Sequence, residues 1–174
     1  IEKKGYIDQL DLFAAWRSMG VSFEAKIVGD GELRKALETQ ITELGLDDCV
    51  QLTGKLNYEA VDAIYQNSDL FLFCGKVSAS GDRDGFPNVI GEAMSHSLPV
   101  FSTDVSGTTE GVKHEISGYV ISTLDVRNTA TEIYLRMQSV DATILVTRNA
   151  HAWVCDEFST VRNVGKLSSA LWEC

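Results

Sequence analysis

Several features that would define a function are scarce or absent in this sequence. No apolar run approaches the roughly 20 residues that a membrane-spanning helix needs, and no charged segment followed by an apolar one marks a signal peptide. Basic residues are few, because 15 Lys and Arg against 25 Asp and Glu give a net charge of −10. We therefore expect neither a membrane span in this chain nor nucleic-acid binding through phosphate contacts.

Patterns for metals and dinucleotides are also lacking. No two of the four cysteines stand at C-x-x-C spacing, so we expect no zinc site and interpret the thiols as reduced. The D-x-D pattern at 82–84 can hold a divalent cation, but a loop rich in Asp and Gly matches it by chance, and we predict no metal. The turn "GDG" at 29–31 does not continue with the spacing of the G-x-G-x-x-G dinucleotide fingerprint.

What is present fits one globular domain. The chain has 174 residues, 44% of them apolar, which suffices for one core, and no linker or internal repeat divides it. The first residue is Ile1 rather than Met, and we interpret the chain as a piece of a longer protein.

Apolar runs and helical periodicities alternate along the chain. The runs are continuous, as in strands of a parallel sheet that is covered on both faces, so we predict an α/β fold with a doubly wound parallel sheet. Ligands bind such folds outside the carboxyl ends of the strands. The predicted strands are 23–28, 49–53, 70–74, 99–103 and 118–122. The predicted helices are 6–19, 32–44, 58–67 with Asn57 as N-cap, 87–95, 125–138, 143–155 and about 159–172.

The segment "DRDGFPNVIGEAMSHSLP" (82–99) carries the strongest site signal. Pro87 fits the first turn of a helix, and the amino end of that helix offers free N–H groups and a positive dipole end to an anion. Glu92 shares a helix face with Asn88. From the spacing alone, Glu92 can instead be an exposed helix residue without a ligand, and Asp84 a turn residue. Asp30 can instead be a cap of the following helix. The candidate cations, each of which can also be simply solvated, are Lys4, Lys55, Lys76 and Lys113.

An ordered set of motifs now resembles a known family. "IVGDGELRKAL", "VQLTGKL", "SDLFLF", "DGFPNVIGEAMSHSLPV" and "GYVI" occur in this order. Together they resemble the C-terminal, donor-binding domain of retaining glycosyltransferases with the two-domain GT-B fold, above all those that assemble bacterial polysaccharides and lipopolysaccharides. The resemblance covers about residues 1–165.

The resemblance assigns roles to individual residues. Glu92 corresponds to the carboxylate that accepts hydrogen bonds from the ribose hydroxyls, and Asp84 to a glutamate beside the donor sugar and the reaction centre, which makes it our catalytic candidate. Lys4 corresponds to a lysine on the pyrophosphate. The other donor-binding candidates lie in two glycine turns and at the helix start: Gly29, Gly54, Lys55, Leu56, Gly85, Phe86, Pro87, Asn88 and Val89.

The sequence departs from the family in three places. Asp84 is shorter than the usual glutamate, which affects its reach to the sugar. Ser97 stands where the family has glycine before the apolar-Pro pair. The family's pyrophosphate-binding arginine would fall just before Ile1 and is therefore outside this sequence.

The implied function is that of the donor half of a two-domain enzyme. Residues 1–174 would form a single nucleotide-sugar-binding domain, which takes a UDP- or GDP-sugar as substrate and needs no separate cofactor. An N-terminal acceptor-binding domain would be its partner and would make any membrane contact, so we expect a cytoplasmic location, up to the inner face of the membrane. On its own the chain would show no turnover. Two alternatives stay open: a GT-B-fold sugar-nucleotide epimerase, and a non-catalytic, flavodoxin-like domain that binds a partner.

Overall fold

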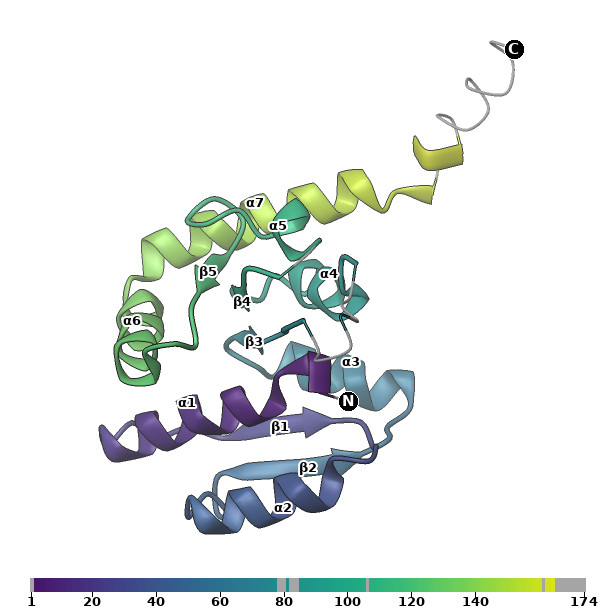
Figure 1. Ribbon diagram of the computed structural model, residues 1–174. Coiled ribbons are helices and arrows are strands. Elements are labelled where there is room, and N and C mark those ends of the chain that lie inside the picture. Colours follow the sequence, from purple (N-terminus) through teal and green to yellow (C-terminus); the bar gives the residue numbers. More distant parts are fainter. Residues whose placement is uncertain (1, 78–80, 82–84, 106, 161, 165–174) are drawn as a thin grey trace.

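The computed structural model describes residues 2–77, 81, 85–105, 107–160 and 162–164 (Figure 1). In this part of the chain no helix is both long and apolar enough to cross a membrane. The helices are η1 (Glu2–Lys4), α1 (Tyr6–Ser18), α2 (Arg34–Glu43), α3 (Tyr58–Gln66), α4 (Asn88–Ser95), α5 (Thr108–Gly111), α6 (Val126–Gln138) and α7 (Val140–Glu157). The strands are β1 (Ala25–Val28), β2 (Val50–Gly54), β3 (Phe71–Phe73), β4 (Val100–Thr103) and β5 (Tyr119–Ile121).

All strand pairs are parallel, as the sequence predicted. β1 pairs with β2 in register Ala25↔Val50, and β4 lies between β3 and β5 in a second sheet. The α/β class with helix-joined parallel strands is confirmed. Four of the predicted strands contain the observed one, and the prediction at 49–53 ends one residue before β2 does, at Gly54. The predicted helix at 159–172 falls largely outside the described residues.

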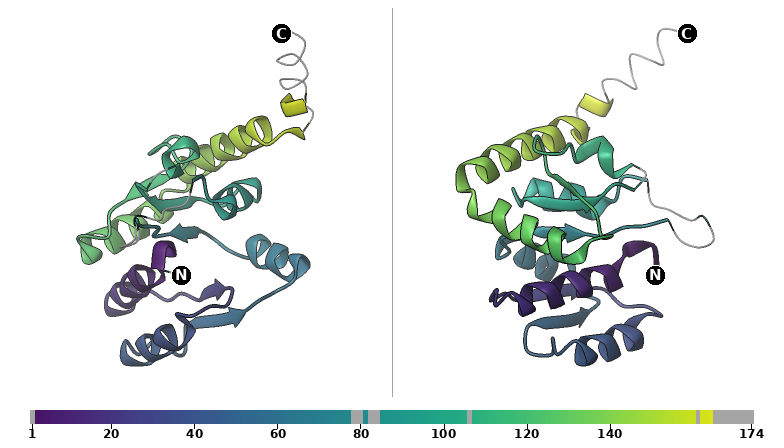
Figure 2. Two further views of the ribbon diagram at one scale, coloured as in Figure 1. Left: turned by 45° about the vertical axis from the view of Figure 1, so that its right-hand side comes forward. Right: turned by 60° about the vertical axis from the view of Figure 1, so that its left-hand side comes forward.

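The sheet consists of two parts rather than one continuous layer. Figure 2 shows β1 and β2 set apart from β3, β4 and β5. The first turns of α1 contact the three-stranded part. The Gln9 side-chain amide donates to the carbonyl of Leu72 in β3 at 3.4 Å. The Gly5 backbone also packs so closely on the Cys74 carbonyl that a Cβ there would stand 1.6 Å from its oxygen. Contacts of α1 therefore hold the end of β3.

Two apolar clusters lie in different layers. One joins buried side chains of α1, α2 and α6 to both parts of the sheet and includes Ile27 of β1 and Phe101 of β4. The other joins α3, α4 and α7 to the three-stranded part through Phe73 and Val100. The three-stranded part is thus covered on both faces, and every residue of β4 is buried.

The two-stranded part departs from the predicted two-sided cover. Lys26 and Gln51 pair across β1 and β2, and both are exposed. Ile27 and Val50 face the other way and are buried. Successive side chains of β1 and β2 therefore lie alternately on a buried and a solvated face, because Lys26 and Gln51 interrupt the apolar runs.

Candidate functional site

Helix α4 begins where the sequence predicted a site. Pro87 is its N-cap residue, and among the described residues no side chain caps its first turn. The first turn of a helix leaves backbone N–H groups without intrahelical partners, at the positive end of the dipole. Gly85 and Asn88 are exposed beside this turn. The start of α4 can therefore receive an anion.

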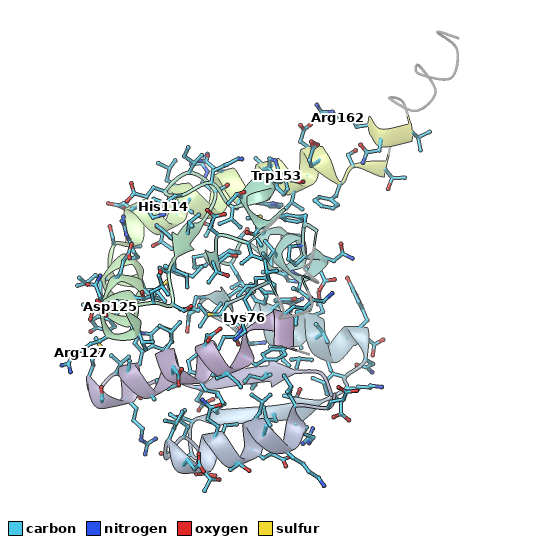
Figure 3. The ribbon with its side chains drawn as sticks, viewed as in Figure 1. Lys76, His114, Asp125, Arg127, Trp153 and Arg162 are labelled. Atoms are coloured by element: carbon cyan, nitrogen blue, oxygen red, sulfur yellow. The ribbon has the colours of Figure 1, made fainter. Side chains whose placement is uncertain are left out.

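The residue before Pro87 anchors the turn rather than facing a ligand with its ring. The Phe86 ring packs on Trp153 at 5.2 Å and on Phe158 at 5.9 Å between centroids. Trp153 lies on α7 beside α5 (Figure 3). Phe86 was predicted to bind the donor. Only its backbone is available for this, because its side chain packs on Trp153 and Phe158.

Glycine allows a second loop to touch this turn. Gly107 precedes α5 with φ +30°, and a Cβ there would stand 2.5 Å from both the Gly85 carbonyl carbon and the Phe86 nitrogen. Any other residue at 107 would force the two loops apart. The loop after β4 thereby supports the turn that starts α4.

Glu92 is exposed on α4, and its carboxylate accepts a hydrogen bond from a tyrosine of another helix. The Tyr65 hydroxyl, from α3, donates to Glu92 Oε2 at 3.1 Å and also lies 3.4 Å from the Val89 carbonyl oxygen. The Glu92 carboxylate therefore lies over the preceding turn, toward the amino end of α4. Burial of the Tyr65 ring, together with the Glu92 charge, raises the pKa of the phenol, so it stays a donor.

A histidine closes the same cluster. His96 Nδ1 is 2.8 Å from the Glu92 carbonyl oxygen, and His96 Nε2 is 2.8 Å from Asp62 Oδ1. Both partners are acceptors, which favours a doubly protonated ring. The hydrogen bond to the Glu92 carbonyl and the Asp62 carboxylate accordingly raise the pKa of His96. Its ring stacks on Tyr65 at 5.0 Å.

The other predicted residues gather at the carboxyl ends of β1 and β2. The Gly29 N–H donates to the Gly54 carbonyl at 2.9 Å, and both glycines have positive φ. A cavity of about 260 Å³ is lined in part by Gly29, Arg34 and Lys4. Lys55 and Leu56 follow β2 and are exposed. Asp30 accepts from the Gly31 N–H and does not cap α2, which begins at Arg34.

The candidate cations differ in their surroundings. Lys4 Nζ lies 5.7 Å from the centre of the Phe73 ring, at the end of β3. Lys76 pairs with Asp8 at 3.2 Å, and Figure 3 shows it near the start of α1. Lys113 donates to the Thr109 carbonyl. Lys4 thus lines the cavity, and Lys76 and Lys113 are not among its lining residues.

The catalytic candidate Asp84 and the D-x-D pattern lie outside the described residues, so their roles stay predictions. The sequence reading missed Tyr65, Asp62 and His96 as members of the site. One signal was available for His96, which stands four residues after Glu92 on the same helix face. None was available for Tyr65, because an aromatic residue on an apolar helix face predicts only core packing.

Parallel strands joined by helices, with glycine turns and an uncapped helix start at their carboxyl ends, characterise Rossmann-like α/β domains. The profile of the family described as glycosyl transferases group 1 matches residues 1–138, and the chain belongs to this family.

Two curated relatives are similar over most of the chain. The amylovoran biosynthesis glycosyltransferase AmsK of Erwinia amylovora is 34% identical over 159 residues, which are 91% of this chain and 39% of the relative. The putative colanic acid biosynthesis glycosyltransferase WcaL of Escherichia coli K12 is 33% identical over 132 residues, 76% of this chain and 32% of the relative. The chain thus spans well under half of either protein, and both are named for polysaccharide biosynthesis.

Solved glycosyltransferases share the fold. Anabaena HepE, in a complex with UDP, superposes with a TM-score of 0.83 at 23% identity, over 100% of this chain and 46% of that chain. The C-terminal domain of the group 1 glycosyl transferase LpcC from Francisella tularensis superposes with a TM-score of 0.73 at 16% identity, over 92% of this chain and 82% of that chain. The predicted GT-B half is thereby confirmed as a fold.

Proposed function

We propose that this chain is the nucleotide-sugar-binding half of a retaining glycosyltransferase that builds a bacterial polysaccharide. The observation that carries the proposal is the uncapped start of α4, with Glu92 one turn further on at the carboxyl ends of the strands. An anion site beside a carboxylate suits a nucleoside diphosphate, which has phosphates next to a ribose diol. A second, acceptor-binding domain lies outside this sequence in the proposal.

The diphosphate is held at the start of α4. Backbone N–H groups around Gly85 and Asn88 donate to phosphate oxygens, and the helix dipole favours the negative charge. Lys4, at the end of β3, adds a positive charge. Such donors stabilise the diphosphate as it leaves the sugar, when its charge increases. Since protein groups supply this neutralisation, donor binding needs no metal ion.

The nucleoside extends from the phosphates toward β2. Glu92 accepts hydrogen bonds from the ribose hydroxyls, and the turns with Gly29 and Gly54 allow the backbone to approach closely. Lys55 and Leu56 lie beside the base. Asp84 would stand by the sugar in the catalytic position, and the remainder of catalysis consists of positioning donor and acceptor.

The donor is a UDP- or GDP-sugar in this proposal. HepE is solved with UDP, and one relative is named as a GDP-mannose-dependent mannosyltransferase of Mycobacterium tuberculosis at 25% identity. The enzyme would act in the cytoplasm, up to the inner face of the membrane, with membrane contact through the other domain.

A ligand-observed NMR screen tests the proposal. UDP-glucose, GDP-mannose and ADP-glucose are each mixed with the chain, and saturation transfer to the ribose protons is recorded with magnesium and again with EDTA. We expect transfer to the UDP- or the GDP-sugar, unchanged by EDTA and displaced by the free diphosphate. Absence of transfer to all three would refute donor binding, and a tenfold loss of affinity with EDTA, about 1.4 kcal/mol, would refute metal independence.

A further inference from the structure

A buried tyrosine from another helix holds the carboxylate on which the proposed function depends. Tyr65 is only 9% exposed, yet its hydroxyl reaches Glu92 Oε2 at 3.1 Å, while Glu92 itself is exposed. An exposed glutamate ordinarily samples several rotamers. Here a fixed donor selects the rotamer in which the carboxylate lies over the first turn of α4, because the same hydroxyl lies 3.4 Å from the Val89 carbonyl oxygen.

The tyrosine ring is itself held on two sides. It stacks on His96 with centroids 5.0 Å apart and tilts against Phe71 at 6.1 Å. His96 is fixed in turn by Asp62, which lies one turn before Tyr65 on α3. Gln66 donates to the second Asp62 oxygen at 2.6 Å. The cluster therefore joins α3 to α4, and it leaves the phenol little freedom of position.

We propose that Tyr65 is a positioning residue for nucleotide binding, which fixes one oxygen of Glu92 so that the other accepts from a ribose hydroxyl. This inference rests on the proposed function of Glu92. Without the Tyr65 hydroxyl, Glu92 keeps its charge and its place on α4 but regains its rotamer freedom. Ordering it again on binding costs part of the conformational entropy of a glutamate side chain.

The test compares Tyr65→Phe with Tyr134→Phe, the same change at a partly exposed tyrosine of α6. UDP and GDP are titrated by calorimetry, and melting temperatures are recorded. For the diphosphate that binds, Tyr65→Phe should raise Kd about five- to tenfold, and Tyr134→Phe should leave it unchanged. The melting temperature should fall little, because Phe retains the ring contacts.

Two further titrations separate positioning from a structural role. The 2′,3′-dideoxy form of the same diphosphate gives Glu92 no hydroxyl to bind, so Tyr65→Phe should change its Kd less than about twofold. In a Glu92→Ala background, Tyr65→Phe should also have no further effect, because the residue that it positions is gone.

Each outcome has one meaning. Loss of affinity for both the ribo- and dideoxy-diphosphates by the same factor would overturn positioning, as would full affinity in Tyr65→Phe while Glu92→Ala binds weakly; the proposed function would survive both results. If Glu92→Ala binds the ribo-diphosphate as wild type does, the role of Glu92 in the proposed function fails, and this inference fails with it.

Discussion

The two parts of the sheet differ in how they are covered. β1 and β2 bury one face and expose Lys26 and Gln51 on the other, whereas all of β4 is buried between helices on both sides. The loops at the carboxyl ends of the two parts differ in the same way. Lys55, after β2, is exposed, while the turn before α4 is anchored through the Phe86 ring on α7.

This difference separates two kinds of recognition in the proposed site. The ribose and the diphosphate need groups at fixed distances, and these lie on the part that is packed from both sides. Contacts beside the base tolerate more movement, and they lie on the part that is packed from one side. Fixed geometry is thus placed where the core restrains it.

The largest expected effect tests the difference in cover. Phe101→Ala removes a fully buried ring that stacks on Tyr119 at 4.7 Å, and should lower the free energy of unfolding by about 3–5 kcal/mol. Lys26→Ala, on the open face of β1, should change it by less than about 0.5 kcal/mol. Urea denaturation measures both, with Phe101→Leu as a milder variant. Equal losses for Phe101→Ala and Lys26→Ala would show that both parts are covered alike.

The next effect concerns ligand affinity in the two parts. Glu92→Ala should weaken nucleoside diphosphate binding about ten- to a hundredfold, since a charge-assisted hydrogen bond contributes about 1.5–3 kcal/mol. Lys55→Ala should weaken it about fivefold or less, because Lys55 is a flexible surface charge. Calorimetric titration measures both, and melting curves check that neither variant unfolds. A larger loss in Lys55→Ala would reverse the comparison.

A smaller effect concerns the end of α4. Ser97 has φ +57°, in the left-handed region that costs a non-glycine residue about 1–2 kcal/mol. Ser97→Gly relieves this strain at some entropic cost, so we expect a net gain of about 0.5–1 kcal/mol in the free energy of unfolding. The matched control is Ser95→Gly at the last residue of α4, which should destabilise by about 0.5 kcal/mol. Two losses of stability would contradict the strain at Ser97.

The smallest effect is on pH dependence. The folded protein raises the pKa of His96, so its stabilisation is fully present below the unfolded value of about 6.5 and is lost as pH rises through the folded pKa. The melting temperature of wild type minus that of His96→Gln should therefore shrink from about pH 5.5 to about pH 8.5. A wild-type advantage that grows with pH would mean that neutral His96 is the stabilising form.

Local signals in the sequence predicted much of the fold. Asn57 caps α3 by accepting from the Ala60 N–H at 2.9 Å, as predicted, and Asp125 caps α6 in the same way. These contacts join residues three apart, so residue type and spacing suffice to predict them. The division of the sheet was not predicted, because it depends on how strands distant in the sequence pair.

The parts of the site that lie within one short segment were predictable from the sequence. The contacts between segments distant in the sequence were not. The start of α4 follows from Pro87 and the apolar pattern after it. The Tyr65–Glu92 hydrogen bond joins residues 27 apart, and only packing of α3 on α4 forms it. Ser97 could be noticed as a departure from the family, but its strain is visible only in the backbone angle.

The glycine at 107 has a mechanical consequence. Gly107 touches the backbone of Gly85 and Phe86, and a Cβ at Gly111, at the other end of α5, would stand 2.6 Å from both the Phe86 and the Trp153 rings. The turn before α4 is in close contact with α5, and α5 is in close contact with α7. A displacement of that turn by an arriving ligand must therefore shift α5 or open a void, and the close packing of the interior resists the void. A displacement of the turn before α4 would therefore be passed through α5 to α7, on which Trp153 lies.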